Sequence, residues 1–363
     1  MRLDAIKPIY QQDGPFVTVY AEVGRNTEDA VAQREARWTT LRHQLEHAGV
    51  PSSLIADLGD LMNDNTHLEG EVRRTVVASG DSIVFDDVQP GHTHWPEMFD
   101  IAPLPDLSGW LAAADASRSF LLVNTDRVRA DISLHRALPG PPDAERSVDG
   151  DDFYITKVAE GDWAQKQFQQ TAENTWKHNA SLVADEARTL ARRHGTTATL
   201  IAGETRARSE VARALELDAE ALAPVIEIES GGRAAGASSS ALWDEVTEVV
   251  TGLAREHDTD IAARLAEARG RGEGAATGLD DVVAALAQSR VEHLVVDMPE
   301  FKGRTISTER FGGIPLPDGA LGESELPADR ALVAAAALTG ASLNLLPSAM
   351  SHGGGVAALL RWT

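Results

Sequence analysis

The chain has 363 residues, of which 43% are hydrophobic and 25% are charged, so its composition is that of a globular protein with two or three domains. Its formal net charge of −23 argues against general nucleic-acid affinity, and the absence of cysteine excludes disulfides, thiolate nucleophiles and thiolate metal ligands. Neither a signal sequence nor a run of about 18 apolar residues is readable, so we expect a cytoplasmic protein without a membrane segment.

Residues 1–118 are predicted to form a mixed α/β N-terminal domain. The expected elements are a strand over 16–23, helices over 26–48 and 52–63, hairpin strands over 71–78 and 81–85, and a strand and helix within 103–114. Within this domain Trp110 is expected in the core. The segment from His92 to Trp95 offers two histidines as metal ligands, but no third ligand at a suitable spacing, so we expect no metal there.

Residues 119–275 are predicted to form a second α/β domain. The expected elements are strands over 119–124 and 130–135, an exposed loop over 139–152, a strand over 153–157, a long helix over 161–195, a strand over 197–202, a helix over 206–217, a strand over 225–228 and a second long helix over 243–269. The β-α-β alternation indicates parallel strands. The glycine-rich run 270–276 is predicted to be a flexible joint, because it lacks the Gly-Lys-Ser/Thr ending of a phosphate loop.

Residues 276–363 are predicted to form a small α/β sandwich. Its expected elements are helices over 279–288 and 328–338 and strands over 291–297, 342–346 and 356–361. The stretch from Leu332 to Leu338 is apolar on all sides, which favours a place in the core over a contact surface.

The long helix over 161–195 has two distinct faces when its residues are placed 100° apart. One face carries an apolar stripe of Phe168, Ala172, Trp176, Ala180, Val183, Ala187 and Leu190. The opposite face carries Lys166, Lys177, Arg188 and Arg192, and Arg193 follows directly. Two interpretations stay open: a solvated face with ordinary ion pairs, or a surface that contacts RNA phosphates.

The segment GDWAQKQF, from Gly161 to Phe168, resembles the junction between the Gly-Gly-Gln loop and the long helix of archaeal and eukaryotic class-1 release factors. Residues 331–363 also resemble the end of these factors and of Pelota, with an apolar helix, a strand, a glycine turn and a closing strand. The chain is most similar to the bacterial branch of this release factor-like family, which includes Balon-like ribosome hibernation factors. The resemblance implies a ribonuclease-H-like middle domain and a C-terminal docking domain like a small RNA-binding ribosomal protein.

Gly161, Asp162 and Trp163 occupy the place of the Gly-Gly-Gln motif, so the resemblance implies a protein without the peptide-releasing chemistry. The nearby Gln165 is a weak catalytic candidate, because its position on the helix points toward the apolar stripe. The N-terminal domain also lacks the Asn-Ile-Lys-Ser and Tyr-x-Cys-x-x-x-Phe patterns with which these release factors recognise stop codons. Termination at a stop codon is therefore not expected.

The resemblance implies a non-hydrolytic factor that binds rRNA of the ribosomal A site and peptidyl-transferase centre during hibernation, stress or rescue. Its rRNA contacts would be Lys166, Lys177, Arg188, Arg192 and Arg193. We also expect that a translational GTPase such as EF-Tu delivers the protein and that the protein is monomeric off the ribosome. We expect no cofactor or metal. Two alternatives stay open: a peptidyl-tRNA hydrolase or tRNA-cleaving rescue enzyme that uses Gln165, and an acidic adaptor that binds only proteins.

A metal-dependent nuclease is the remaining enzyme class that the sequence raises. Asp126, Asp131, Asp151 and Asp152 flank strands of the middle domain, where a two-metal site would need converging carboxylates. Because they fall in turns and a loop, we expect them to form turns and to face solvent.

Overall fold

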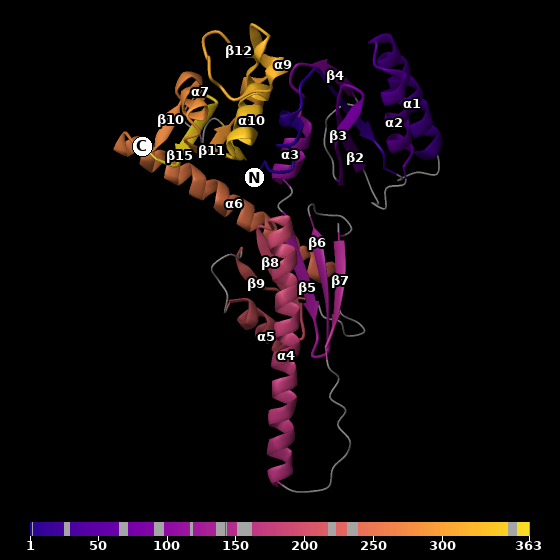
Figure 1. Ribbon diagram of the computed structural model, residues 1–363. Coiled ribbons are helices and arrows are strands. Elements are labelled where there is room, and N and C mark those ends of the chain that lie inside the picture. The colour runs from indigo at the N-terminus through magenta and orange to yellow at the C-terminus, as the bar shows by residue number, and fades with distance from the viewer. Residues whose placement is uncertain are drawn as a thin grey trace. The chain divides into compact units, whose positions relative to one another are not determined.

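The chain divides into two units in the computed structural model (Figure 1). Residues Met1–Ala116 and Arg255–Thr363 form the first unit, and Ser117–Ala254 form the second. The long helix α6 (Ser239–Arg271) contributes its first half to the second unit and its second half to the first. The structure describes all residues except 2, 25–29, 65–71, 91–97, 117–118, 136–141, 143, 151–161, 217–222, 231–238, 348–353 and 363.

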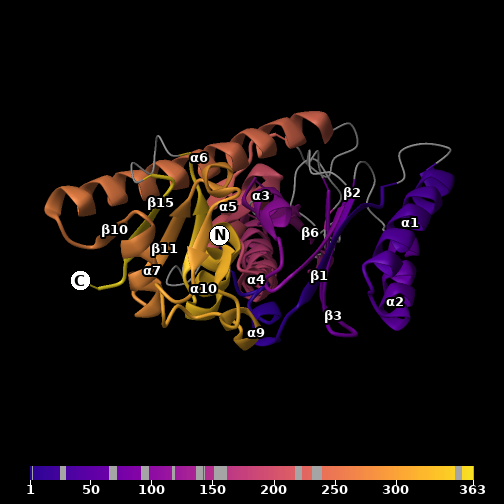
Figure 2. The same ribbon diagram turned by 90° about the horizontal axis from the view of Figure 1, so that it is seen from above.

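The N-terminal part of the first unit is an antiparallel sheet with the strand order β3-β2-β1-β4. Its strands are β1 (Phe16–Glu22), β2 (Val72–Ser79), β3 (Ser82–Pro90) and β4 (Met98–Ala102). Helices α1 (Ala30–His47) and α2 (Ser52–Asn63) lie side by side in both views and cover one face (Figures 1 and 2). The alternation of β1 places Val17, Val19 and Ala21 against these helices, so this face forms its own apolar core.

The C-terminal part of the first unit is a mixed sheet with the order β10-β15-β11-β14. Its strands are β10 (Ala275–Thr277), β11 (Val291–Val296), β14 (Ser342–Leu345) and β15 (Val356–Leu360), and only the pair β11–β14 is parallel. Helices α7 (Leu279–Ala287) and α10 (Ala328–Thr339) pack on one face. The second half of α6 packs on the other through Ile261 and Leu265.

Four short elements lie between β11 and α10, a region where the sequence predicted none. They are α8 (Met298–Phe301), β12 (Thr305–Ser307), α9 (Asp318–Leu321) and β13 (Glu325–Pro327). Phe301, Ile306 and Leu326 from this segment are buried in the core beneath α10. Elements of three or four residues are too short for a periodic pattern, so they depend on this packing.

One apolar core joins the N-terminal and C-terminal parts of the first unit. Leu3, Ile6 and Leu104 on the N-terminal side belong to the same buried cluster as Leu332 and Val333 of α10. The short helix η1 (Ile9–Gln11) and α3 (Ser108–Ala116) contribute to it from the N-terminal side. The first and last parts of the chain therefore bury their apolar surfaces together.

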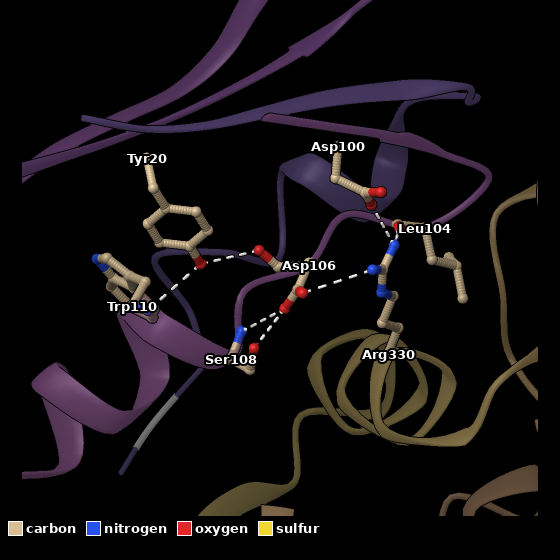
Figure 3. Close-up of polar contacts among 7 residues, drawn as sticks. All are labelled: Tyr20, Asp100, Leu104, Asp106, Ser108, Trp110 and Arg330. Atoms are coloured by element: carbon tan, nitrogen blue, oxygen red, sulfur yellow. Dashed lines mark hydrogen bonds and ion pairs between the residues drawn. The ribbon is translucent and has the colours of Figure 1, made fainter. Parts of the chain in front are cut away.

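Arg330 of α10 connects these two parts by polar contacts (Figure 3). Its Nη1 donates to Asp100 Oδ2 at 2.5 Å and to the carbonyl of Leu104 at 3.1 Å, and its Nη2 lies 3.4 Å from Asp106 Oδ2. The Asp106 carboxylate also accepts hydrogen bonds from the backbone and hydroxyl of Ser108. The Arg330 guanidinium thus faces two carboxylates and a carbonyl, and opposite charges of this kind are the condition for burying a charge.

Tyr20 supports the same junction from β1 (Figure 3). Its hydroxyl donates to the backbone carbonyl of Asp106 at 2.8 Å. Burial raises the pKa of the Tyr20 phenol, so the group remains a hydrogen-bond donor at neutral pH. The neighbouring Trp110 is buried as expected, and its Nε1 donates to Asp87 Oδ2 at 2.7 Å.

The second unit is built on a five-stranded sheet with the order β7-β6-β5-β8-β9. The strands are β5 (Phe120–Thr125), β6 (Arg129–His135), β7 (Ala144–Asp149), β8 (Ala198–Gly203) and β9 (Val225–Glu227). Strands β5, β8 and β9 are parallel, while β6 and β7 are antiparallel to their neighbours. Helices α4 (Asp162–His194) and α5 (Thr205–Glu216) cover one face, and the first half of α6 covers the other.

Two sequence predictions, the exposed loop over 139–152 and the flexible joint over 270–276, are wrong, and a third, the strand over 153–157, is not tested by the structure. The loop expected over 139–152 contains strand β7, and the strand expected over 153–157 lies outside the described residues. Among the described strands β7 pairs with β6 alone, so it forms an edge of the sheet. An edge strand tolerates charged side chains, and Asp149 of β7 forms an ion pair with Arg129 of β6 at 2.6 Å. The flexible joint expected over 270–276 is instead the end of α6 followed by β10, which pairs with β15.

Other expectations are confirmed. The parallel pairing of β8 and β9 agrees with the β-α-β pattern, and the C-terminal sequence folds as a helix, a strand, a glycine turn and a strand. Helix α10 is buried from Ala331 to Ala337, as its apolar sequence predicted. The helix expected within 103–114 is α3, but no strand lies in that range, because β4 ends before it at Ala102.

Candidate functional site

The second half of the long helix α4 is anchored to its sheet. Ala180, Val183, Ala187 and Leu190 are buried against strands and against α5, as the apolar stripe predicted. Figure 1 shows the N-terminal half of α4 running past the sheet. Since a helix rises 1.5 Å per residue, the part from Asp162 to His178 is about 25 Å long. This geometry presents the start of the helix at the end of an arm.

Trp176 marks the place where the arm meets the sheet. The guanidinium carbon of Arg127 lies 4.9 Å from the centre of its indole ring, and that of Arg206 lies 4.6 Å from it. Arg127 comes from the turn after β5, and Arg206 from the first turn of α5. Cations over an indole face are attracted by the quadrupole of the ring. We call Trp176, Arg127, Arg206 and Glu204 the Trp176 corner.

Glu204 holds Arg127 in this position. The Arg127 Nε lies 2.7 Å from Glu204 Oε1 and 2.8 Å from Oε2, and its Nη2 also contacts Oε1. Both side chains are about half exposed, with 49% of the Arg127 side chain and 37% of the Glu204 side chain accessible. The ion pair therefore fixes geometry more than it stabilises the fold, because exposed pairs contribute at most about 1 kcal/mol.

The backbone beneath the Trp176 corner requires two glycines. Gly203 has a φ of +124°, and a Cβ there would lie 1.9 Å from the carbonyl oxygen of Thr125. A Cβ on Gly150 would lie 2.3 Å from Cγ of Asn179, which is buried and donates to the carbonyl of Arg127 at 3.1 Å. These close approaches bring the ends of β5 and β8, the end of β7 and helix α4 together.

A small hollow adjoins the Trp176 corner. It is lined by the turn after β5 and by one face each of α4 and α5, including Asn179 and Val183. Asp126 lies beside it, and its Oδ1 accepts hydrogen bonds from the backbone of Val128 and Arg129 at 2.9 Å. This contact confirms the expected turn-forming role of Asp126. Asp131 accepts from Ser147 at 2.8 Å, and Asp151 and Asp152 lie outside the described residues.

Nothing in the described part of the chain gathers three or more His, Asp or Glu side chains in a way that could hold a metal ion. His92, His94 and Trp95 lie outside that part. Among the same described residues, no helix is both long and apolar enough to cross a membrane.

The predicted motif residues lie where α4 begins. Gly161 is outside the described residues, and Asp162 and Trp163 are the first residues of the helix. Gln165 and Lys166 fall in its first two turns, and the structure describes the backbone of these positions only. The helix begins within one residue of the start predicted for it at 161, so Asp162 and Trp163, which were predicted as the equivalent of the loop, lie in its first turn.

The predicted basic residues fall into two groups. Lys177, Arg192 and Arg193 are exposed on α4. Arg188 is not: only 12% of its side chain is accessible, its Nη1 lies 2.7 Å from Asp185 Oδ1, and its Nη2 donates to the carbonyl of Ala214. Arg188 thus joins α4 to α5. Placing the residues of one helix 100° apart could not predict this contact, because that construction contains no neighbouring helix.

The sequence did not predict that Arg127 and Arg206 lie over the ring of Trp176. Trp176 was assigned to the apolar stripe, although its ring is only half-buried. Its two cationic neighbours come from positions about fifty residues before it and thirty after it, so no local pattern connects them. The available signal is a tryptophan within the apolar stripe, a large ring that can accept cations on its face.

Comparison with protein families gives one match in the middle of the chain. Residues 119–271 match the model of "Bacterial archaeo-eukaryotic release factor family 2". Two uncharacterized proteins of Mycobacterium tuberculosis, from strains CDC 1551 and H37Rv, are each 26% identical over 374 aligned positions. Each alignment covers 100% of this chain and 97% of the relative.

Solved structures with similarity to this chain include Pelota and its relatives. Archaeoglobus fulgidus Pelota is 12% identical, with 99% of this chain and 92% of that chain covered and a TM-score of 0.29. Dom34 of S. cerevisiae, described as a translation termination-like factor, is 8% identical, with 98% and 91% covered and a TM-score of 0.41.

Proposed function

We propose a function from the premise that residues 119–271 match the model of bacterial archaeo-eukaryotic release factor family 2: the protein is a translation factor that binds the ribosome. The observation that carries the proposal is α4, a 33-residue helix whose second half packs on the sheet and whose N-terminal half runs past it (Figure 1). An arm of this kind can carry a loop into a narrow ribosomal site while the sheet remains outside.

The proposed action is non-hydrolytic occupation of the A site, in hibernation, stress or rescue. Its support is chemical: Asp162 and Trp163 stand where the resemblance places the second glycine and the glutamine of Gly-Gly-Gln. A carboxylate and an indole cannot position water against an ester as a flexible glycine and an amide do, whereas an indole can stack on a base. A translational GTPase such as EF-Tu would deliver the protein, and we place it in the cytoplasm accordingly.

The proposed rRNA contacts are Lys166, Lys177, Arg192 and Arg193 on α4, together with Arg206 at the Trp176 corner. Lys177, Arg192, Arg193 and Arg206 are exposed in a protein that is otherwise strongly acidic. An arginine stacked on an indole keeps its N–H groups directed outward, where they can donate to phosphate oxygens. We leave Arg188 out, because it joins α4 to α5.

Co-sedimentation with vacant and stalled ribosomes tests this proposal. The triple variant Lys177→Glu, Arg192→Glu, Arg193→Glu should bind at least tenfold more weakly. The slope of the logarithm of its binding constant against the logarithm of the salt concentration should be shallower by about 2, because each lost phosphate contact removes about 0.7 to 0.9 from that slope. The matched control reverses three exposed arginines elsewhere, Arg42, Arg213 and Arg304, and should bind like the wild type. Equal binding by both variants would favour the acidic adaptor.

Peptide release from stalled complexes tests the non-hydrolytic part separately. We expect no release above that of ribosomes alone, and a Gln165→Ala variant that binds and behaves like the wild type. Release or tRNA cleavage that Gln165→Ala abolishes would instead establish the rescue enzyme.

A further inference from the structure

Arg34 is a buried arginine in the first unit, and no described residue matches its charge. Only 8% of the residue is accessible, and within the described part of the chain its Nε and Nη1 have no hydrogen-bond partner and no acid forms an ion pair with it. It lies on the face of α1 that also carries Trp38, Leu41 and Leu45, which pack toward the sheet. Taking a guanidinium out of water without a partner is unfavourable, so the site needs a reason to keep it.

A pocket lies beside Arg34. Its lining comes from the end of β1, from α1 and from α2 and includes Val23, Arg34, Arg37, Trp38, Gln44 and Met62. The hollow has an empty volume of about 690 Å³, including space open to solvent, which is the size range of small-molecule sites. It lies near the end of β1, beyond the last residue that pairs with β4, which is Tyr20.

The chemistry of the lining is that of a site for an organic anion. Arg34 supplies a desolvated positive charge, and the exposed Arg37 adds a second one. Trp38, Leu41 and Met62 supply an apolar wall, and Gln44 supplies an amide. Among the described lining residues the one acid is Glu22, which lies 3.7 Å from Arg73 and is thus already engaged by another arginine.

Arg74, in strand β2 of the sheet that α1 covers, is a buried arginine whose contacts stabilise the fold. Its Nε and Nη2 donate to the two carboxylate oxygens of Asp86 at 2.7 and 2.8 Å, and its Nη1 donates to the carbonyl of Leu61. Every nitrogen is satisfied, as expected for a structural guanidinium. Arg34 differs from Arg74 in having two nitrogens left over at the wall of a pocket.

We propose that this pocket binds a small organic anion, whose carboxylate or phosphate pairs with Arg34 and whose flat apolar body lies against Trp38, Leu41 and Met62. Arginine suits both groups, because its planar donors match carboxylate and phosphate oxygens. The site belongs to the first unit and contains no residue of α4, so it does not depend on the proposed ribosomal function.

Calorimetry and thermal melting of the full chain test the proposal with three probes. A nucleoside 5′-monophosphate represents a phosphate on a flat body, indole-3-acetate represents a carboxylate on a flat body, and inorganic phosphate represents the bare group. We expect at least one of the first two to bind and to raise the melting temperature by about 5 °C at 100 times its Kd, and inorganic phosphate to bind more weakly. If neither organic probe binds, the proposal is wrong.

Arg34→Met separates a ligand site from a structural residue. The variant should weaken binding of the organic probe by about 10- to 100-fold, since a charge-assisted hydrogen bond is lost. Without ligand, it should melt at a higher temperature than the wild type, because an unmatched buried charge is replaced by an apolar side chain of similar volume. Arg42→Gln, an exposed change on the same helix, should alter neither quantity. A lower melting temperature of Arg34→Met with unchanged probe binding would overturn the proposal.

Discussion

The junction around Arg330 and the pocket around Arg34 lie in the same unit and treat a buried arginine in opposite ways. Arg330 meets two carboxylates and a carbonyl, whereas Arg34 leaves two nitrogens without a partner within the described part of the chain. Only the first arrangement offsets the loss of hydration by contacts within the protein. The difference indicates that Arg330 stabilises the fold and that Arg34 is placed to pair with a ligand.

Among the changes to these arginines, removing Arg330 should lower the free energy of unfolding most. Arg330→Met leaves Asp100 and Asp106 without their cation at a junction where the Arg330 side chain is only 16% accessible. We expect the free energy of unfolding of the first unit to fall by about 4 kcal/mol. Urea denaturation measures it, and Arg304→Met, which removes a 49% exposed arginine, is the control with an expected change below about 0.5 kcal/mol.

Removing Arg74 should have the next largest effect. Arg74→Met deprives Asp86 and the carbonyl of Leu61 of their donors, and we expect a loss of about 3 kcal/mol in the same denaturation experiment. The double variant with Asp86→Asn should lose less than the sum of the two single changes, because both remove the same pair. Additive losses would mean that Arg74 and Asp86 do not stabilise each other.

Removing Arg34 should change stability in the opposite direction. We expect Arg34→Met to raise the free energy of unfolding by about 1 kcal/mol, the lower end of the gain seen when apolar side chains replace buried charges. A loss comparable to that of Arg74→Met would place Arg34 among the structural arginines and end the distinction between the two sites.

Removing Arg127 should have the smallest effect. Its pair with Glu204 is well aligned but half exposed, so Arg127→Gln should cost less than about 1 kcal/mol, and 0.5 M salt should reduce that cost further. Trp176 fluorescence should change more clearly than stability, since a cation leaves the indole face. An unchanged emission spectrum would mean that Arg127 does not stay on the ring in solution.

Much of the fold could be predicted from local patterns. The apolar periodicity of α4 identified the residues that it buries from Ala180 to Leu190, and the all-apolar sequence of α10 identified a core helix. Strand β7 was missed because it alternates charged and polar residues, which an edge strand allows and which a loop also shows. The short elements from α8 to β13 were missed because three or four residues contain no period.

The candidate sites were harder to predict, because their residues meet across elements. The sequence assigned Ala30, Trp38, Leu41 and Leu45 to one face of α1, and Arg34 lies on that face as well. Whether an arginine at such a position has a carboxylate opposite depends on the sheet that covers it. For Arg74 the partner is twelve residues away on the adjacent strand, and for Arg330 it is 230 residues away.

The sequence by itself determined the longer helices, most strands and the family resemblance, and it predicted that Asp162 and Trp163 replace the last two residues of the Gly-Gly-Gln motif. These follow from side-chain period and residue identity, which are local properties. Only the tertiary structure decided which charges are matched: Arg188 joins two helices, Arg330 joins the two ends of the chain, and Arg34 faces a pocket. Electrostatic pairing acts over a few ångströms in space, so distance along the chain carries no information about it.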